Sequence, residues 1–128
     1  MNRPIGSFDL LGLEVMEAGV EVWAIPHPHM WIRIPDENFS IGLYPEDDNV
    51  LLTRGKIQSP DDVHESDEGA GPNRKIKLDC DKYDFEKFKD YIKEQVNAKP
   101  PIYCVLIGNC GDWVTDVIAA ATIYAEKK

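Results

Sequence analysis

The chain has 128 residues, of which 43% are hydrophobic and 29% are charged, and its net charge is -9. This length suits one globular domain over residues 1–128 with a single core, not a disordered or fibrous chain. Nucleic acid is excluded as a partner, because phosphates would be repelled and the basic residues form no stripe.

No apolar run approaches the roughly 18–20 residues that a membrane span requires. The first residues also lack the apolar stretch of a signal peptide, so classical secretion is not expected. The three cysteines are an odd number and match no zinc-ligand spacing, which favours thiols over disulfides or a metal site.

The first part of the chain has β-strand patterns. Residues 20–25 alternate and are β-branched, and residues 29–34 and 39–44 are β-rich runs joined by Pro-Asp-Glu-Asn, which predicts a hairpin. If the hairpin turns symmetrically, Tyr44 lies opposite His29. Residues 59–73 are acidic and rich in turn formers, which predicts a solvated loop, and residues 74–79 alternate as a half-exposed strand would.

From residue 84 the apolar period changes to that of helices. Residues 84–97 form an amphipathic pattern that ends at Pro100-Pro101, residues 102–107 are an apolar run of strand length, and a second helix begins near Cys110. The chain is therefore predicted to be α+β: an antiparallel β-sheet packed against a Cys-bearing helix and a second helix.

The stretch Gly108-Asn109-Cys110-Gly111 places a thiol where a helix begins. The positive end of the helix dipole stabilises a thiolate there, and first-turn amides could hold an oxyanion. Gly111 leaves space for a substrate backbone, and Asn109 supports the loop by its amide or its turn conformation. Against this, cysteine is often a buried packing residue.

This arrangement resembles the circularly permuted papain-like (NlpC-type) cysteine hydrolases and the lecithin retinol acyltransferase-like families, in which a His strand precedes an Asn-Cys helix. Residues 29–34 are similar to that His strand, and residues 40–45 are similar to the strand that follows it. The segments 100–103 and 108–110 also resemble domains of bacterial contact-dependent and type VI-associated toxins. The resemblance covers roughly residues 20–124. Asp112 stands where the acyltransferase branch has His, which argues against lipid acyltransferase activity.

The resemblance implies that Cys110 is the nucleophile and His29 its general base. His27 is the fallback base, and His64 is expected to be solvated within the acidic loop. A third polar residue normally orients such an imidazole. Tyr44 is the candidate by the hairpin register, although a Tyr on a strand often only packs. Weaker candidates are Ser40 and Glu46.

The remaining cysteines and the tryptophans have simpler interpretations. Cys104 lies in an apolar run and is expected in the core, and Cys80 precedes acidic residues that disfavour a thiolate. The tryptophans could line a groove, but core packing is the safer expectation for all of them: Trp23, Trp31 and Trp113.

The expected function is hydrolysis or transfer at an amide or ester through a Cys110 acyl-enzyme, without cofactor or metal. The resemblance implies an amidase or endopeptidase on peptidoglycan peptide. It also implies an interbacterial effector with a cognate immunity protein, made in the cytoplasm and exported without a signal peptide to a target cell or periplasm. Three alternatives remain: a lipid acyl hydrolase or transferase, a small acidic binding or immunity-type protein, and a metal site of His27, His29 and Cys110.

Overall fold

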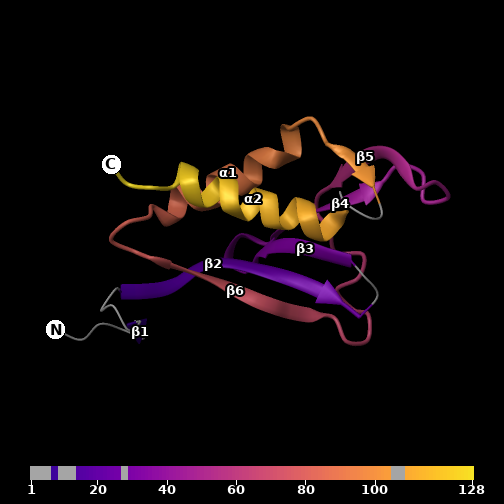
Figure 1. Cartoon of the computed structure of the whole chain (residues 1–128). Coiled ribbons are helices and arrows are strands. Elements are labelled where there is room, and N and C mark those ends of the chain that lie inside the picture. The colour runs from indigo at the N-terminus through magenta and orange to yellow at the C-terminus, as the bar shows by residue number, and fades with distance from the viewer. Residues whose placement is uncertain (1–6, 9–13, 27–28, 105–108) are drawn as a thin grey trace.

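The protein is an α+β structure in which two helices pack on one face of an antiparallel sheet (Figure 1). The computed structural model describes residues 7–8, 14–26, 29–104 and 109–128. Its strands are β1 (Ser7–Phe8), β2 (Glu14–Ile25), β3 (His29–Ile34), β4 (Phe39–Pro45), β5 (Leu52–Gln58), β6 (Gly71–Asp79) and β7 (Ile102–Cys104). Its helices are α1 (Phe85–Glu94) and α2 (Cys110–Tyr124), and short 3-10 turns cover Pro35–Glu37 and Gln95–Asn97.

The strands follow the order β1-β2-β3-β4-β5-β7, and β6 pairs with β2. The β3–β4 hairpin pairs Trp31 with Gly42 and Ile34 with Phe39. This is the symmetric register that the sequence predicts, and its continuation brings Tyr44 opposite His29. β5 was not expected from the sequence, since charged and small residues such as Arg54 and Gly55 dominate it.

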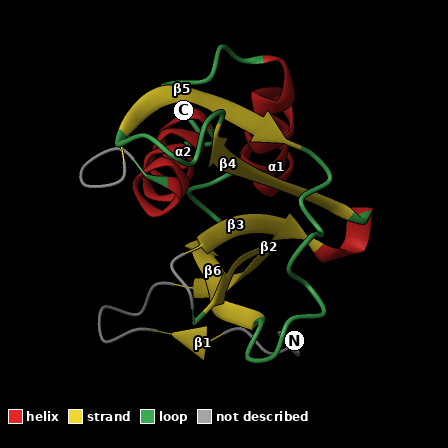
Figure 2. Cartoon of the chain, turned by 90° about the vertical axis from the view of Figure 1, so that its right-hand side faces the viewer, coloured by secondary structure: helices red, strands yellow, loops and turns green. Residues whose placement is uncertain are grey.

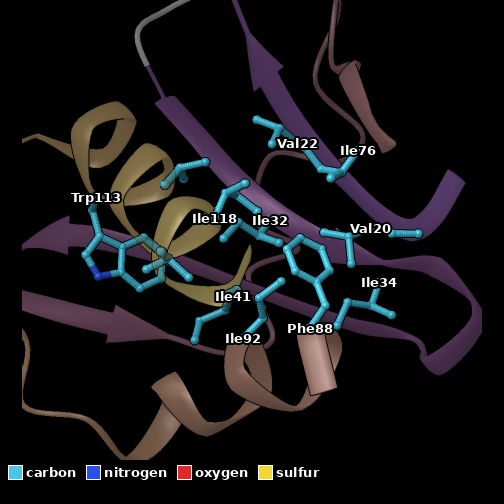
Figure 3. Packing of buried hydrophobic residues seen from close by; sticks show 14 of the residues in the cluster. Val20, Val22, Ile32, Ile34, Ile41, Ile76, Phe88, Ile92, Trp113 and Ile118 are labelled. Atoms are coloured by element: carbon cyan, nitrogen blue, oxygen red, sulfur yellow. The ribbon is translucent and has the colours of Figure 1, made fainter. Parts of the chain in front are cut away.

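Alternation along the strands directs one set of side chains toward the helices. On β2 and β3 these are aliphatic, and Phe88 of α1 points between Val20, Ile32 and Ile34 (Figure 3). The amphipathic pattern of residues 84–97 therefore buries its apolar face as predicted, although α1 itself ends at Glu94. Phe88 is fully buried, and a side chain of this size contributes roughly 1.5–3 kcal/mol on burial.

The sheet curls, so that β4 and β5 rise to the level of the helices at the end where α2 begins (Figures 1 and 2). The same end carries the start of β3 at His29. The curl therefore brings the beginning of β3, the strands β4 and β5 and the first turn of α2 to one place.

One expectation about a loop needs correction. The segment predicted as a loop over residues 59–73 ends earlier, because β6 begins at Gly71 and pairs along β2. Of the apolar run at 102–107, residues 102–104 form β7, and the rest lies outside the described residues. Neither of the described helices is both long and apolar enough to cross a membrane.

Candidate active site

Cys110 is the first residue of α2, and Asn109 is its N-cap. The Asn109 side chain accepts a hydrogen bond from the backbone N–H of Asp112 at 3.1 Å, and its carbonyl accepts one from Trp113 at 3.0 Å. Cys110 is only 3% exposed. Its thiol therefore lies, as the sequence predicts, in the positive field of a helix N-terminus and largely away from water.

His29 is the first residue of β3, and its imidazole hydrogen-bonds the thiol of Cys110. The other partner of the ring is Asp61, whose Oδ2 lies 3.0 Å from Nε2 of His29. The imidazole therefore lies between the carboxylate of Asp61 and the thiol of Cys110. The fold thus joins the two residues that the sequence pattern paired, although 81 positions separate them in the chain.

Asp61 is the residue that orients His29, and the sequence pattern did not identify it. It lies within the segment expected to be solvated, yet it is only 1% exposed. The hydroxyl of Tyr44 donates to Oδ1 of Asp61 at 2.6 Å, and the backbone N–H of Asp61 donates to Oγ of Ser40 at 2.8 Å. The prediction that Tyr44 itself bonds the imidazole is therefore wrong: Tyr44 and Ser40 hold Asp61, which holds His29.

Gly42 provides the space for this carboxylate. A Cβ at Gly42 would overlap Oδ2 of Asp61 and lie 3.2 Å from Cβ of Trp31. Glycine in the middle of a strand often marks a close approach by another part of the chain. Gly42 is thus a signal in the sequence that a segment packs closely over β4.

Electrostatics favour an ion pair between Cys110 and His29. Burial raises the pKa of Cys110, but hydrogen bonds from His29 and from the backbone of Met30, and the charge of His29, lower it overall. Burial lowers the pKa of His29, but the hydrogen bonds and charges of Asp61 and Cys110 raise it to about 9. Both directions favour thiolate and imidazolium near neutral pH.

Aromatic rings enclose the imidazole. The Tyr44 ring centroid lies 4.3 Å from that of His29, and Trp31 stacks on His29 at 5.4 Å with an interplanar angle of 20°. Such π faces attract a cationic ring. On the thiol side, Tyr103 of β7 hydrogen-bonds Cys110, and its pKa is raised by burial and by the thiolate charge.

The other predicted residues lie around the site or away from it. A Cβ on Gly111 would lie 3.3 Å from Sδ of Met30, so this glycine permits close packing of α2 on β3. Trp113 is part of the core, Trp23 is half-buried under Arg33, and Glu46 lines a groove with Arg54 instead of the site.

Three further predictions concern the fallback base, the metal and the other thiols. His27 and Gly108 lie outside the described residues. In the part of the chain that the structure describes, no group of three or more His, Cys, Asp or Glu is arranged to hold a metal ion. Cys80 and Cys104 are half-buried, and neither belongs to the Cys110 site.

The chain matches no known protein-family model, no curated protein and no solved structure. The resemblance to permuted papain-like hydrolases therefore stays a prediction from its motifs.

Proposed function

We propose that this protein is a cysteine hydrolase of the permuted papain-like type that cleaves amide or ester bonds through a Cys110 acyl-enzyme. The proposal is supported above all by one arrangement: a thiol at a helix N-terminus, bonded to an imidazole that is bonded in turn to a buried carboxylate. This is the order of nucleophile, base and orienting acid that thiol hydrolysis requires.

In the first half of the reaction the Cys110 thiolate attacks the substrate carbonyl carbon. The carbonyl π electrons move to oxygen, and the positive end of the α2 dipole beside Cys110 stabilises that oxyanion. As the oxyanion collapses, the carbon–nitrogen bond breaks and the His29 imidazolium gives its proton to the leaving amine. The products are a free amine, a thioester on Cys110 and a neutral His29.

In the second half, neutral His29 takes a proton from water and the resulting hydroxide attacks the thioester. The carbon–sulfur bond then breaks, which releases a carboxylic acid and restores the thiolate beside the imidazolium. Asp61 keeps the imidazole in one orientation throughout, since it holds Nε2 while the ring bonds the sulfur of Cys110. The Asp61 carboxylate also stabilises the imidazolium state.

The substrate class rests on the resemblance, which implies peptidoglycan peptide as the substrate and an interbacterial effector as the biological role. The described site adds one restriction. Cys110, His29 and Asp61 are all nearly buried, so a substrate must reach the thiol with a narrow, extended group. A peptide stem meets this requirement better than a globular protein surface does.

The test is alkylation of each cysteine by iodoacetamide as a function of pH, read by peptide mass spectrometry. Cys110 should react rapidly near pH 6–7 and lose this reactivity in His29→Ala and in Asp61→Asn, while Cys80 and Cys104 serve as internal controls. Wild type should then release peptide fragments from purified peptidoglycan and Cys110→Ala should not. If Cys110 titrates like an ordinary thiol, near about 8.5, the acidic binding-protein alternative takes its place.

One observation favours a lipid acyl hydrolase as a second candidate. Leu51, Leu52 and Ile102 are 57%, 63% and 66% exposed, and Leu52 and Ile102 lie diagonally on adjacent strands beside Arg54. Exposed aliphatic side chains beside a cation suit a lipid surface. Co-sedimentation with phosphatidylglycerol vesicles, lost in Leu51→Glu, would favour this candidate over the peptidase.

A further inference from the structure

The segment between β5 and β6 carries a second histidine into the site. His64 was expected in solvent, but its side chain is only 29% exposed. Its ring centroid lies 5.3 Å from that of His29, 6.4 Å from that of Trp31 and 6.5 Å from that of Tyr44. The mechanism proposed for hydrolysis gives His64 no proton to transfer and no bond to Cys110.

His64 is held in this place by contacts on both sides of it in the chain. Its Nδ1 lies 2.7 Å from Oδ2 of Asp67. The neighbouring Glu65 lies 3.6 Å from Nε of Arg33 on β3, and Asp61 anchors the start of the segment in the interior. The His64 side chain thus bonds one carboxylate, and two further carboxylates tie its segment to β3 and to the interior, so His64 is not a freely solvated residue.

The rings around His29 are held in place by different parts of the chain. Trp31 and Tyr44 belong to the β3–β4 hairpin and are fixed by the sheet. His64 comes from a segment without regular structure and contacts the imidazole at an interplanar angle of 59°. It is therefore the one described ring beside His29 whose position depends on the loop, and its removal would leave the imidazole open on that side.

We propose that His64 is a positioning residue of the proposed hydrolase: its ring closes the aromatic enclosure of His29 and keeps the imidazole in hydrogen-bonding contact with Cys110. The inference rests on the proposed function, because it acts through the Cys110–His29 pair. His64 itself needs no contact with the substrate, and its role is to limit the rotation of His29 away from the sulfur.

Charged and titratable groups face His64 from each neighbouring element. They are Asp67 on its own segment, His29 on β3 and Tyr44 on β4. A phenylalanine would keep the ring contacts and lose only the bond to Asp67, whereas an alanine would lose both. The two substitutions therefore separate ring packing from nitrogen chemistry.

The experiment measures the pH midpoint of Cys110 alkylation in His64→Ala and His64→Phe. In His64→Ala we expect the midpoint to rise by about one unit, which lowers the thiolate fraction about tenfold below the midpoint. His64→Phe should restore the wild-type midpoint. Val63→Ala is the matched control, since Val63 is 54% exposed on the same segment and should change nothing.

Either of two results would overturn the inference: an unchanged midpoint in His64→Ala, or a midpoint in His64→Phe as high as in His64→Ala. If His64→Ala does not fold, judged by near-UV circular dichroism, His64→Val replaces it. That variant fills part of the space but has no ring, so the midpoint should rise by a smaller amount, and no change would count against the proposal. If the proposed function itself is wrong, the result is different, because His29→Ala would then also leave the alkylation midpoint of Cys110 unchanged.

Discussion

The two helices begin in different ways. α1 is capped by Asp84, whose carboxylate accepts hydrogen bonds from the amides of Glu86 at 3.0 Å and Lys87 at 3.1 Å. α2 is capped by Asn109, a neutral side chain that accepts from Asp112. Both caps satisfy backbone donors, but only the first also neutralises the positive end of the helix dipole with a full charge.

This difference matches the residue that comes directly after each cap. The first residue of α1, Phe85, packs against the core, and a negative cap there simply stabilises the helix. The first residue of α2 is Cys110, whose thiolate gains from the same positive field. The neutral cap adds no charge to that field, and the one acidic residue in the first turn of α2 is Asp112. The cap of α1 thus suits a stable helix start, and the cap of α2 agrees with the reactive role that we propose for Cys110.

The largest effect is expected from Gly42→Ala, which disturbs the site at the start of α2 without changing any of its polar groups. The new methyl group would displace Asp61 from the space beside Trp31. Overpacking of this kind costs roughly 1–3 kcal/mol, and Cys110 should lose its rapid alkylation at neutral pH because His29 loses its orienting partner. Urea unfolding and alkylation measure the two effects.

Gly71→Ala is the matched control for Gly42→Ala. A Cβ at Gly71 meets no atom within 4 Å, so its stability should stay within about 0.5 kcal/mol of wild type. Normal alkylation of Cys110 in Gly42→Ala would contradict the role that we assign to Asp61.

A smaller effect is expected from Asn109→Asp, which gives α2 the kind of cap that α1 has. Aspartate caps as well as asparagine, so the helix should remain intact. The added negative charge next to the thiolate should raise the alkylation midpoint of Cys110 by on the order of one unit.

The reciprocal variant Asp84→Asn should cost about 0.3–1 kcal/mol of stability and leave Cys110 unchanged. Thermal unfolding and alkylation of both variants test the comparison directly. An unchanged midpoint in Asn109→Asp would mean that the neutral cap has no bearing on reactivity.

The smallest expected effect is on the pH dependence of stability. Because the pKa of His29 rises from 6.5 to about 9 on folding, its contribution to stability is complete below pH 6.5 and is lost as the pH rises toward 9. The lowered pKa of Cys110 acts in the opposite direction, since its contribution grows as the pH rises. The two contributions therefore partly cancel in wild type.

Cys110→Ser removes the second contribution and weakens the first, since Cys110 is one of the groups that raise the pKa of His29. The melting temperature of the variant should fall more steeply than that of wild type between pH 6.5 and 9, by a few degrees for a chain of this size. The pKa of His29 should be less raised in this variant but still elevated, since Asp61 remains. Parallel curves for the two proteins would show that the thiol and the imidazole are not coupled.

Much of the fold follows from local patterns. The β3–β4 hairpin, the amphipathic α1 and the start of α2 at Cys110 each depend on residues close in sequence, so their periodicity and turn residues predict them. β5 was missed because Arg54, Gly55 and Lys56 give no strand pattern of their own, and their strand exists through pairing with β4 and β7. Pairing between distant segments leaves little trace in a short window of sequence.

The sequence by itself therefore determined the α+β class, the hairpin that carries His29 and the placement of Cys110 at a helix start. Only the tertiary structure decided which of the many acidic residues orients His29, and that His64 lies beside it. The reason is physical: Asp61 and His64 have solvated neighbours in sequence, and their burial comes from β3 and β4, whose contacts with Asp61 span 17 to 32 positions of the chain. Local composition predicts whether a segment is polar enough to be solvated, while the burial of a single side chain depends on which distant elements pack against it.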